Sequence, residues 1–90
     1  MSIPEFVVEP ILVQARFLPD GTVQPTAFIW RDHTRYIADW GRQWQEAAEG
    51  VSWRCYLVRT PTLETFELRY APAEGRWVLW RAWGDVIRDA

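Results

Sequence analysis

The sequence has no lysine and only one cysteine, one histidine and one methionine. The single cysteine, Cys55, cannot form an internal disulfide, so no disulfide framework holds the fold. One histidine and one cysteine also cannot supply the three or four clustered ligands of a zinc site. The five glycines are isolated from one another, which excludes a glycine-rich phosphate loop. We therefore expect neither a metal site nor a bound cofactor.

Charge and hydropathy exclude further classes of protein. The ten basic residues, all arginine, stand against twelve acidic residues and give a net charge of −2. This balance is too acidic for a strong electrostatic nucleic-acid footprint. No apolar run approaches the roughly 18 residues of a membrane span, and the first residues lack a secretory signal pattern. We expect a cytoplasmic protein that does not enter the membrane.

Length and composition predict one folded domain. The chain has 90 residues, 49% of them apolar and 16% aromatic, and it contains seven tryptophans. Large rings bury much apolar area at low rotamer cost, so a few of them can build the core of a small domain. We treat residues 1–90 as a single domain and expect residues 1–10 to be a flexible N-terminal segment.

Short apolar runs separated by turn residues predict a mainly β fold. Pro25 has no backbone N–H to donate to a neighbouring strand, which favours an edge position or a bulge at that point. Large apolar residues occupy both faces of 76–83, which is typical of a central strand. Alternation of apolar and polar residues identifies six strands, at residues 11–17, 23–31, 34–40, 53–60, 63–70 and 76–83.

One short helix is predicted between Gly41 and Gly50. This segment is rich in good helix formers and ends at a glycine, and Trp44 would anchor it onto the sheet. Residues 84–90 are expected to form a last helical turn. The predicted fold is an antiparallel meander of about six strands with one short helix, in a curved sheet or a small barrel.

The segment from Phe28 to Trp40 raises the question of a catalytic histidine, because His33 stands beside Asp32. Sequence neighbours on a strand point to opposite faces, so Asp32 would orient His33 poorly. Aromatic arms of similar length on both sides of the polar centre RDHT instead predict a β-hairpin. We interpret this centre as the turn, with His33 at an exposed tip.

Cys55 is the other residue that could serve as a nucleophile or base. It lies in the middle of a predicted strand and shares a face with Trp53 and Leu57, which is typical of a buried structural cysteine. No residue is assigned a catalytic role, and we do not expect an enzyme.

Arginine alternates with aromatic residues in WRDHTRY, WRCY and RWVLWRAW. On neighbouring strands these residues could form a platform of rings flanked by cations, although the tryptophans could equally be core and the arginine stems could cover the sheet edges. One small core cannot hold all seven tryptophans, so we expect one to three to stay partly exposed, among Trp40, Trp44 and Trp83. The candidate binding surface consists of Trp30, Arg31, Arg35, Trp40, Trp44, Arg54, Arg76, Arg81 and Trp83.

Three functions are compatible with this surface. The first is a non-catalytic interaction module that binds a protein partner, since Trp, Tyr and Arg dominate interface hot spots. The second is a single-stranded nucleic-acid-binding accessory domain, in which bases stack on the rings. A small-ligand binder or an enzyme ranks last, because the sequence offers no set of nucleophile, base or metal ligands.

Two segments, PTAFIWRDHTRYIADWGRQWQ and EGRWVLWRAW, resemble a small bacterial domain of unknown function over most of residues 25–83. The shared pattern is Phe-x-Trp-Arg, a tight turn, an aromatic strand ending in a Trp-containing segment, and a final Gly-Arg-Trp strand. The residues that carry it are Phe28, Trp30, Arg31, Tyr36, Trp40, Trp44 and Gly75-Arg76-Trp77.

Members of the resembled family occur alone or as a C-terminal appendage of proteins similar to Y-family DNA polymerases. The family often has Arg-Gly-Arg where this chain has the longer Arg31-Asp32-His33. The resemblance implies an accessory role in DNA repair or damage tolerance, through contact with DNA or with a repair protein. That implication rests on domain context and not on a physical property of the residues.

Overall fold

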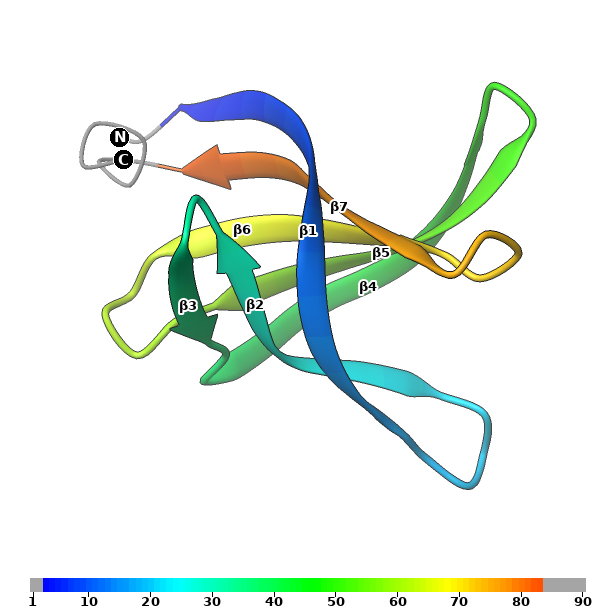
Figure 1. Cartoon of the computed structure of the whole chain (residues 1–90), viewed down its shortest axis with the longest axis horizontal. Coiled ribbons are helices and arrows are strands. Elements are labelled where there is room, and N and C mark those ends of the chain that lie inside the picture. Colours follow the sequence, from blue (N-terminus) through cyan, green and yellow to red (C-terminus); the bar gives the residue numbers. More distant parts are fainter. Residues whose placement is uncertain (1–2, 84–90) are drawn as a thin grey trace.

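The computed structural model describes residues 3–83, which form seven β-strands and no helix (Figure 1). This confirms the predicted mainly β class, with one strand more than expected. The residues 84–90, for which a last helical turn was predicted, lie outside the described part of the chain. The strands are β1 (Pro4–Phe17), β2 (Val23–Trp30), β3 (His33–Tyr36), β4 (Asp39–Ala48), β5 (Val51–Arg59), β6 (Thr65–Ala71) and β7 (Arg76–Trp83).

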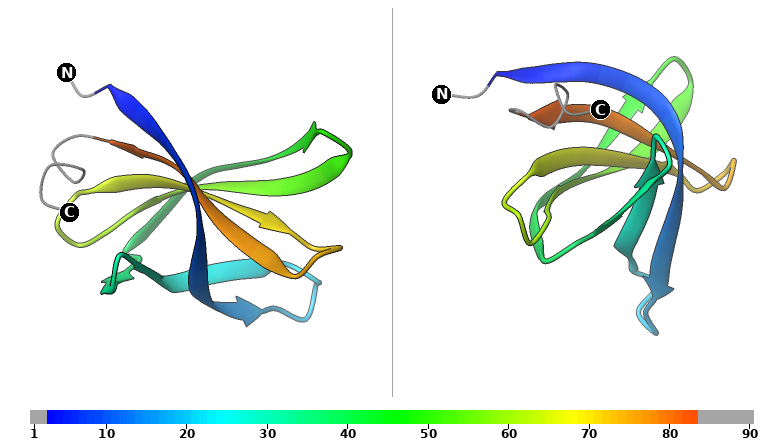
Figure 2. Two further views of the ribbon diagram at one scale, coloured as in Figure 1. Left: turned by 45° about the horizontal axis from the view of Figure 1, so that its top comes forward. Right: turned by 60° about the vertical axis from the view of Figure 1, so that its left-hand side comes forward.

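All seven strands belong to one antiparallel sheet with the order β3-β2-β1-β7-β6-β5-β4. The two edge strands, β3 and β4, follow each other in the chain, so the sheet must curve strongly for the short link between them to reach (Figure 2). In this link Ile37 N donates to Thr26 O at 3.0 Å and Ala38 N donates to Arg59 O at 2.8 Å. The predicted curved antiparallel sheet is confirmed, and it does not close into a barrel.

Strand β1 joins the two halves of the sheet. Its residues 4–11 pair with β7, and its residues 12–17 pair with β2. A bulge between Phe6 and Glu9, where Val8 has a φ of 51°, coincides with the sharp bend of β1 in Figure 1. We expected residues 1–10 to be a flexible segment, but residues 4–10 are instead held in the sheet by β7.

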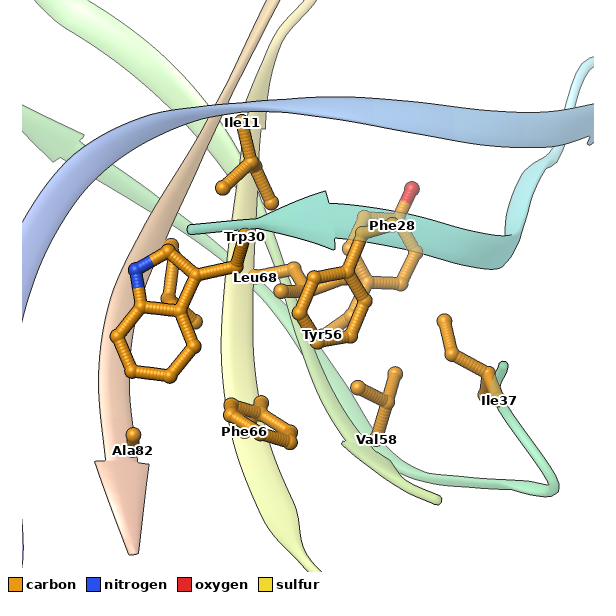
Figure 3. Close-up of a cluster of buried hydrophobic side chains, with 10 residues drawn as sticks. Ile11, Phe28, Trp30, Ile37, Tyr56, Val58, Phe66, Leu68 and Ala82 are labelled. Carbon is orange, nitrogen blue, oxygen red and sulfur yellow. The ribbon is translucent and has the colours of Figure 1, made fainter. Parts of the chain in front are cut away.

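The main core fills the space enclosed by the curved sheet (Figure 3). Phe66 is completely buried, and its ring contacts Phe28 edge-on with a centroid distance of 5.0 Å and Trp30 with a distance of 6.0 Å. Burying each such side chain contributes roughly 1.5–3 kcal/mol of transfer free energy. The buried members are Ile11, Phe28, Trp30, Ile37, Tyr56, Val58, Phe66, Leu68, Leu79 and Ala82.

A second apolar cluster lies on the opposite face of β4–β7, which we call the outer face. Its buried members are Trp53, Cys55, Ala71 and Val78, and it is extended by the partly buried Trp44 and Trp80 among others. The predicted double-sided character of 76–83 is therefore confirmed, and β7 is a central strand. No strand of the described chain covers this outer face (Figure 2).

The helix predicted for 41–50 is wrong, because these residues form β4 and the turn that follows it. Ala48 is opposite Val51, and the two residues between them, Glu49 and Gly50, have φ values of 52° and 79°. Two consecutive positive φ angles define the type I′ turn whose twist matches a β-hairpin. Pairing with β5 thus overrides the helix propensity of Gln43, Gln45 and the alanines.

The other predicted turns are present. Gly21 has a φ of 87°, and the turn at Asp20-Gly21 joins β1 to β2. The polar centre RDHT is a hairpin turn, made by Arg31 and Asp32 with φ values of 51° and 63°. His33 is exposed as predicted, but it is the first residue of β3 and pairs with Trp30.

Two β-bulges adjust the faces of the central strands. The β1–β2 register shifts next to Pro25, as its missing donor led us to expect. The β6–β7 register shifts between Glu67 and Leu68, so that Ala82 is opposite Phe66 in the core. Strict alternation would place Trp83 on the same face as Leu79, but the extra residue in β7 places it on the opposite face.

Candidate interaction surface

The nine candidate residues do not form one surface. Trp30, Arg31 and Arg35 lie around the β2–β3 turn, and Arg54 lies apart from them on β5. The remaining members lie on the outer face or at the edge of the sheet, on β4 and β7. The contacts of these groups differ.

Trp30 is core, with 2% of its surface exposed. Its indole Nε1 donates to Glu9 Oε1 at 2.9 Å, and Arg31 donates to Glu9 Oε2 at 3.1 Å while its guanidinium lies 4.5 Å from the Trp30 ring centroid. The hydrogen bond from Trp30, aided by Arg31, lowers the pKa of the Glu9 carboxyl below its ordinary value. These three side chains fasten the β2–β3 turn to β1.

Arg35 also serves the fold. Its NH1 contacts Glu64 Oε1 at 3.2 Å, and its guanidinium lies 5.3 Å from the Trp30 ring and 5.4 Å from the Phe66 ring. Only 16% of the side chain is exposed, and its Nε is buried without a hydrogen-bond partner. Arg35 therefore lies at the rim of the core, and little of its guanidinium group is accessible to a ligand.

The two candidates on β4 differ. Trp40 donates from Nε1 to Pro25 O at 2.7 Å, which ties the start of β4 to β2 across the open side of the sheet. Trp44 lies on the outer face, where the Arg42 guanidinium covers its ring at 4.8 Å and Glu46 accepts from its Nε1 at 3.3 Å. Only Trp44 is placed where a partner could reach its ring.

The outer face carries a continuous strip of stacked rings and guanidinium groups. Arg76 lies 5.0 Å from the Trp53 ring, Trp53 lies 6.1 Å from Trp80, and Arg69 lies 4.1 Å from the Trp80 ring. Each contact of this type contributes about 0.5–2 kcal/mol, more where water is excluded. We call the set Trp53, Arg69, Arg76, Trp80, Arg81 and Trp83 the Trp/Arg strip.

Glu67 holds the centre of the Trp/Arg strip. It is 0% exposed, and its two carboxylate oxygens bind Arg69, at 2.7 Å, and Arg81. Arg69 has a second partner in Glu46 at 2.8 Å. A carboxylate buried in this way must be paired, so Glu67 fixes both guanidinium groups in one geometry.

The strip ends at an exposed ring. The Arg81 guanidinium lies 4.9 Å from the Trp83 ring and 5.9 Å from the ring of Phe6, on the neighbouring strand β1. Phe6 is 70% exposed, although a phenylalanine of a monomeric domain is usually covered. The outer face thus runs from ordered, half-buried tryptophans to an uncovered apolar side chain.

Tryptophan exposure exceeds the expectation. Trp30 and Trp53 are buried, and the other five are partly exposed, including the expected Trp40, Trp44 and Trp83. The strip residues Trp53, Arg69 and Trp80 were absent from the candidate surface. The sequence contained a signal for Arg69, because Glu67 and Arg69 are two residues apart and so share a face of β6, opposite Phe66 and Leu68.

Two observations concern metal ligands and the one cysteine. In residues 3–83 no three His, Cys, Asp or Glu side chains gather as a metal site would require. Burial raises the pKa of the Cys55 thiol to about 11, so the thiol stays protonated at neutral pH. The same part of the chain contains no helix long and apolar enough to span a membrane.

A smaller apolar patch lies on the far side of the molecule. Leu12, Ile29 and Thr34 are aligned across β1, β2 and β3, with Tyr36 next to them. Leu12 is 72% and Tyr36 64% exposed. The depression between these side chains has a volume of about 230 Å³.

No protein-family model, curated protein or solved structure matches this chain.

Proposed function

We propose that this domain is a non-catalytic interaction module that binds a protein partner through the Trp/Arg strip and Phe6. The observation that carries the proposal is the outer face of β4–β7. It bears ordered tryptophan and arginine side chains, ends at a 70% exposed phenylalanine, and is covered by no strand of the described chain. These residue types dominate the hot spots of protein interfaces.

The pairing of the arginines favours a protein over a nucleic acid as partner. Arg76 contacts Glu74 at 2.5 Å, and Arg81 is bound by Glu67. Phosphate groups would have to displace these carboxylates before the guanidinium groups could neutralise them. The three arginines of the Trp/Arg strip, Arg69, Arg76 and Arg81, each already have a carboxylate partner, so the strip gains little from counterion release.

The same pairing favours binding through stacked apolar surface. Side chains that are fixed before binding lose less conformational entropy in the complex. Trp80 is held under Arg69, and Trp83 is held beside Arg81. A partner with apolar or aromatic side chains would meet a rigid surface that needs no rearrangement.

Two exposed apolar residues of β1 allow a matched test. Phe6, 70% exposed, borders the Trp/Arg strip, whereas Leu12, 72% exposed, lies on the other patch beside Ile29. The tagged chain is used to capture proteins from its source cells, and each captured protein is then purified and titrated by calorimetry. We expect a partner whose binding is lost with Phe6→Ser and retained with Leu12→Ser. Equal binding of every captured protein to both variants would refute the assignment of the face.

One observation favours single-stranded nucleic acid as a second candidate. Arg54 has no carboxylate partner among the described residues and pairs in register with Tyr70, whose ring stacks on Trp77 at 4.6 Å. This candidate also agrees with the resemblance to a domain linked to DNA damage tolerance. An amide NMR titration with a short single-stranded oligonucleotide, at low and moderate salt, separates the two. Salt-sensitive shifts at Arg54 and Trp77 would support this candidate, and unchanged spectra would dismiss it.

A further inference from the structure

Strand β4 is an exposed edge of the sheet, with a bulge between Trp40 and Gln43 and regular pairing to β5 from Gln43 to Ala48. It is 10 residues long, whereas β3, the other edge strand, has only 4 residues. Long edges present unpaired main-chain donors and acceptors to a second strand, and natural proteins usually shorten or cover them. A depression of about 350 Å³ lies between Gln43 and Gln45 on β4 and the β1–β2 turn.

The type I′ turn fixes which groups of β4 face outward. In such a turn the carbonyl of the first residue, Ala48, bonds across to Val51. Hydrogen-bonded and non-hydrogen-bonded pairs then alternate along the antiparallel ladder. The main-chain groups of Ala48, Glu46 and Trp44 therefore point to β5. Those of Ala47, Gln45 and Gln43 point away from it, and these three residues are exposed.

The charges along this edge are arranged symmetrically about Trp44. Arg42 is two residues before Trp44 and stacks on its ring, and Glu46 is two residues after it and accepts from its indole. Arg42 has no carboxylate partner among the described residues, and the Glu46 side chain is 49% exposed. Edge charges normally repel a second strand, but two opposite charges around one centre attract an identical strand in the reverse direction.

We propose that β4 pairs with β4 of a second copy of this chain, antiparallel and with Trp44 opposite Trp44 of the partner copy. In this register Arg42 meets Glu46 of the other copy at both ends of the pair. Gln43 is opposite Gln45 of the other copy, and both have outward-facing main-chain groups, so four hydrogen bonds join the strands. Centring the pair on Glu46 would oppose like charges, and centring it on Gln43 or Gln45 would oppose no charges at all.

The pairing does not depend on the proposed partner surface. In the sheet order, β4 is separated from β7 by β5 and β6, so Phe6 and Trp83 stay uncovered when two copies join through β4. Loss of partner binding and loss of self-association are thus separate results. A monomeric chain would overturn the β4 pairing and leave the partner surface to its own test.

Sedimentation of the full chain over a range of concentrations measures the association. We expect the mass of two chains for the native sequence and of one chain for Arg42→Glu, because this substitution opposes two carboxylates at each end of the pair. Arg16→Glu makes the same charge change at an exposed position of β1 and should still associate. A native chain that remains single at NMR concentrations, or an Arg42→Glu variant that associates like the native chain, would overturn the proposal.

A charge exchange tests the register. Glu46→Arg and Arg42→Glu should each be monomeric, and an equal mixture should form the heterodimer, because every charge then meets its opposite. A mixture that stays monomeric while the native chain associates would refute the Trp44-centred pairing. Should Glu46→Arg fail to fold through loss of its contact with Arg69, amide exchange of the native chain decides instead. Gln43 and Gln45 amides must become protected as concentration rises, and unchanged exchange overturns the register.

Discussion

Replacing Glu67 by glutamine should destabilise the domain far more than any other carboxylate-to-amide change in the described chain. Glu67 is 0% exposed and binds Arg69 and Arg81 at once. Glutamine keeps the shape of the side chain but removes its charge. Two guanidinium groups would then share a site from which their common anion has gone.

The magnitude follows from the exposure of the two arginines. Removing one partner of a buried ion pair costs about 3–5 kcal/mol. Arg69 is 7% exposed but keeps Glu46, and Arg81 is 28% exposed, so water can solvate part of its charge. We therefore expect the lower end, about 3 kcal/mol, which is a large part of the 5–15 kcal/mol that stabilises a typical domain.

Urea denaturation followed by tryptophan fluorescence measures this loss as a lower midpoint at unchanged slope. Glu74→Gln is the matched control, since Glu74 also pairs with an arginine two residues later, Arg76, but both side chains are exposed, at 43% and 50%. An exposed pair contributes about 0–1 kcal/mol. Equal and small losses in Glu67→Gln and Glu74→Gln would refute the view that a buried carboxylate organises the Trp/Arg strip.

Three further predictions concern other parts of the fold. The raised pKa of Cys55, about 11 against an ordinary 9.0, lowers the thiolate fraction about 100-fold at neutral pH, so a disulfide reagent should label the native chain very slowly and the urea-unfolded chain fast. The lowered pKa of Glu9, due to Trp30, means that its stabilisation is present above pH 4.5 and is lost as the pH falls through the folded value. Glu9→Gln should therefore flatten the acid limb of the stability curve, and an unchanged limb would contradict this role. Glu49→Asn should stabilise the β4–β5 turn by about 0.5–1 kcal/mol, because glutamate is strained at a φ of 52°, and a lower thermal midpoint would refute the turn assignment.

Turn chemistry and alternation predicted most of the strands. The β1–β2 and β2–β3 turns contain Gly21 and Asp32, which are residue types that tolerate positive φ. Phe66 and Leu68 alternate clearly with Glu67. The prediction for 41–50 was wrong because the alanines and glutamines of this segment favour a helix. The residues that indicate a β-hairpin are only two. Glu49-Gly50 between two alternating runs is a hairpin signal that glutamate makes weak.

The Trp/Arg strip could be predicted only in part, for a geometrical reason. Period-2 alternation places Glu67 with Arg69 on one face of β6, but it does not say that Arg81 of β7 reaches the same carboxylate. That contact depends on the β6–β7 bulge, which shifts the register next to Leu68. A bulge inserts a residue without a reliable signal in the sequence. Beyond a bulge, alternation therefore no longer predicts which side chains of neighbouring strands are opposite each other.

The bend in β1 also has a consequence for the synthesis of this chain. Residues 4–11 leave the ribosome before the other strands of the sheet, but their neighbours in β7 are translated after β2 to β6, since Pro4 is opposite Trp83. The hairpin of β2 and β3 can form while translation continues. The first half of β1, in contrast, has unpaired main-chain groups until β7 has been synthesised. A nascent chain that stops before Arg76 would expose this edge to other polypeptides, so premature termination should yield an aggregating product and not a smaller folded one.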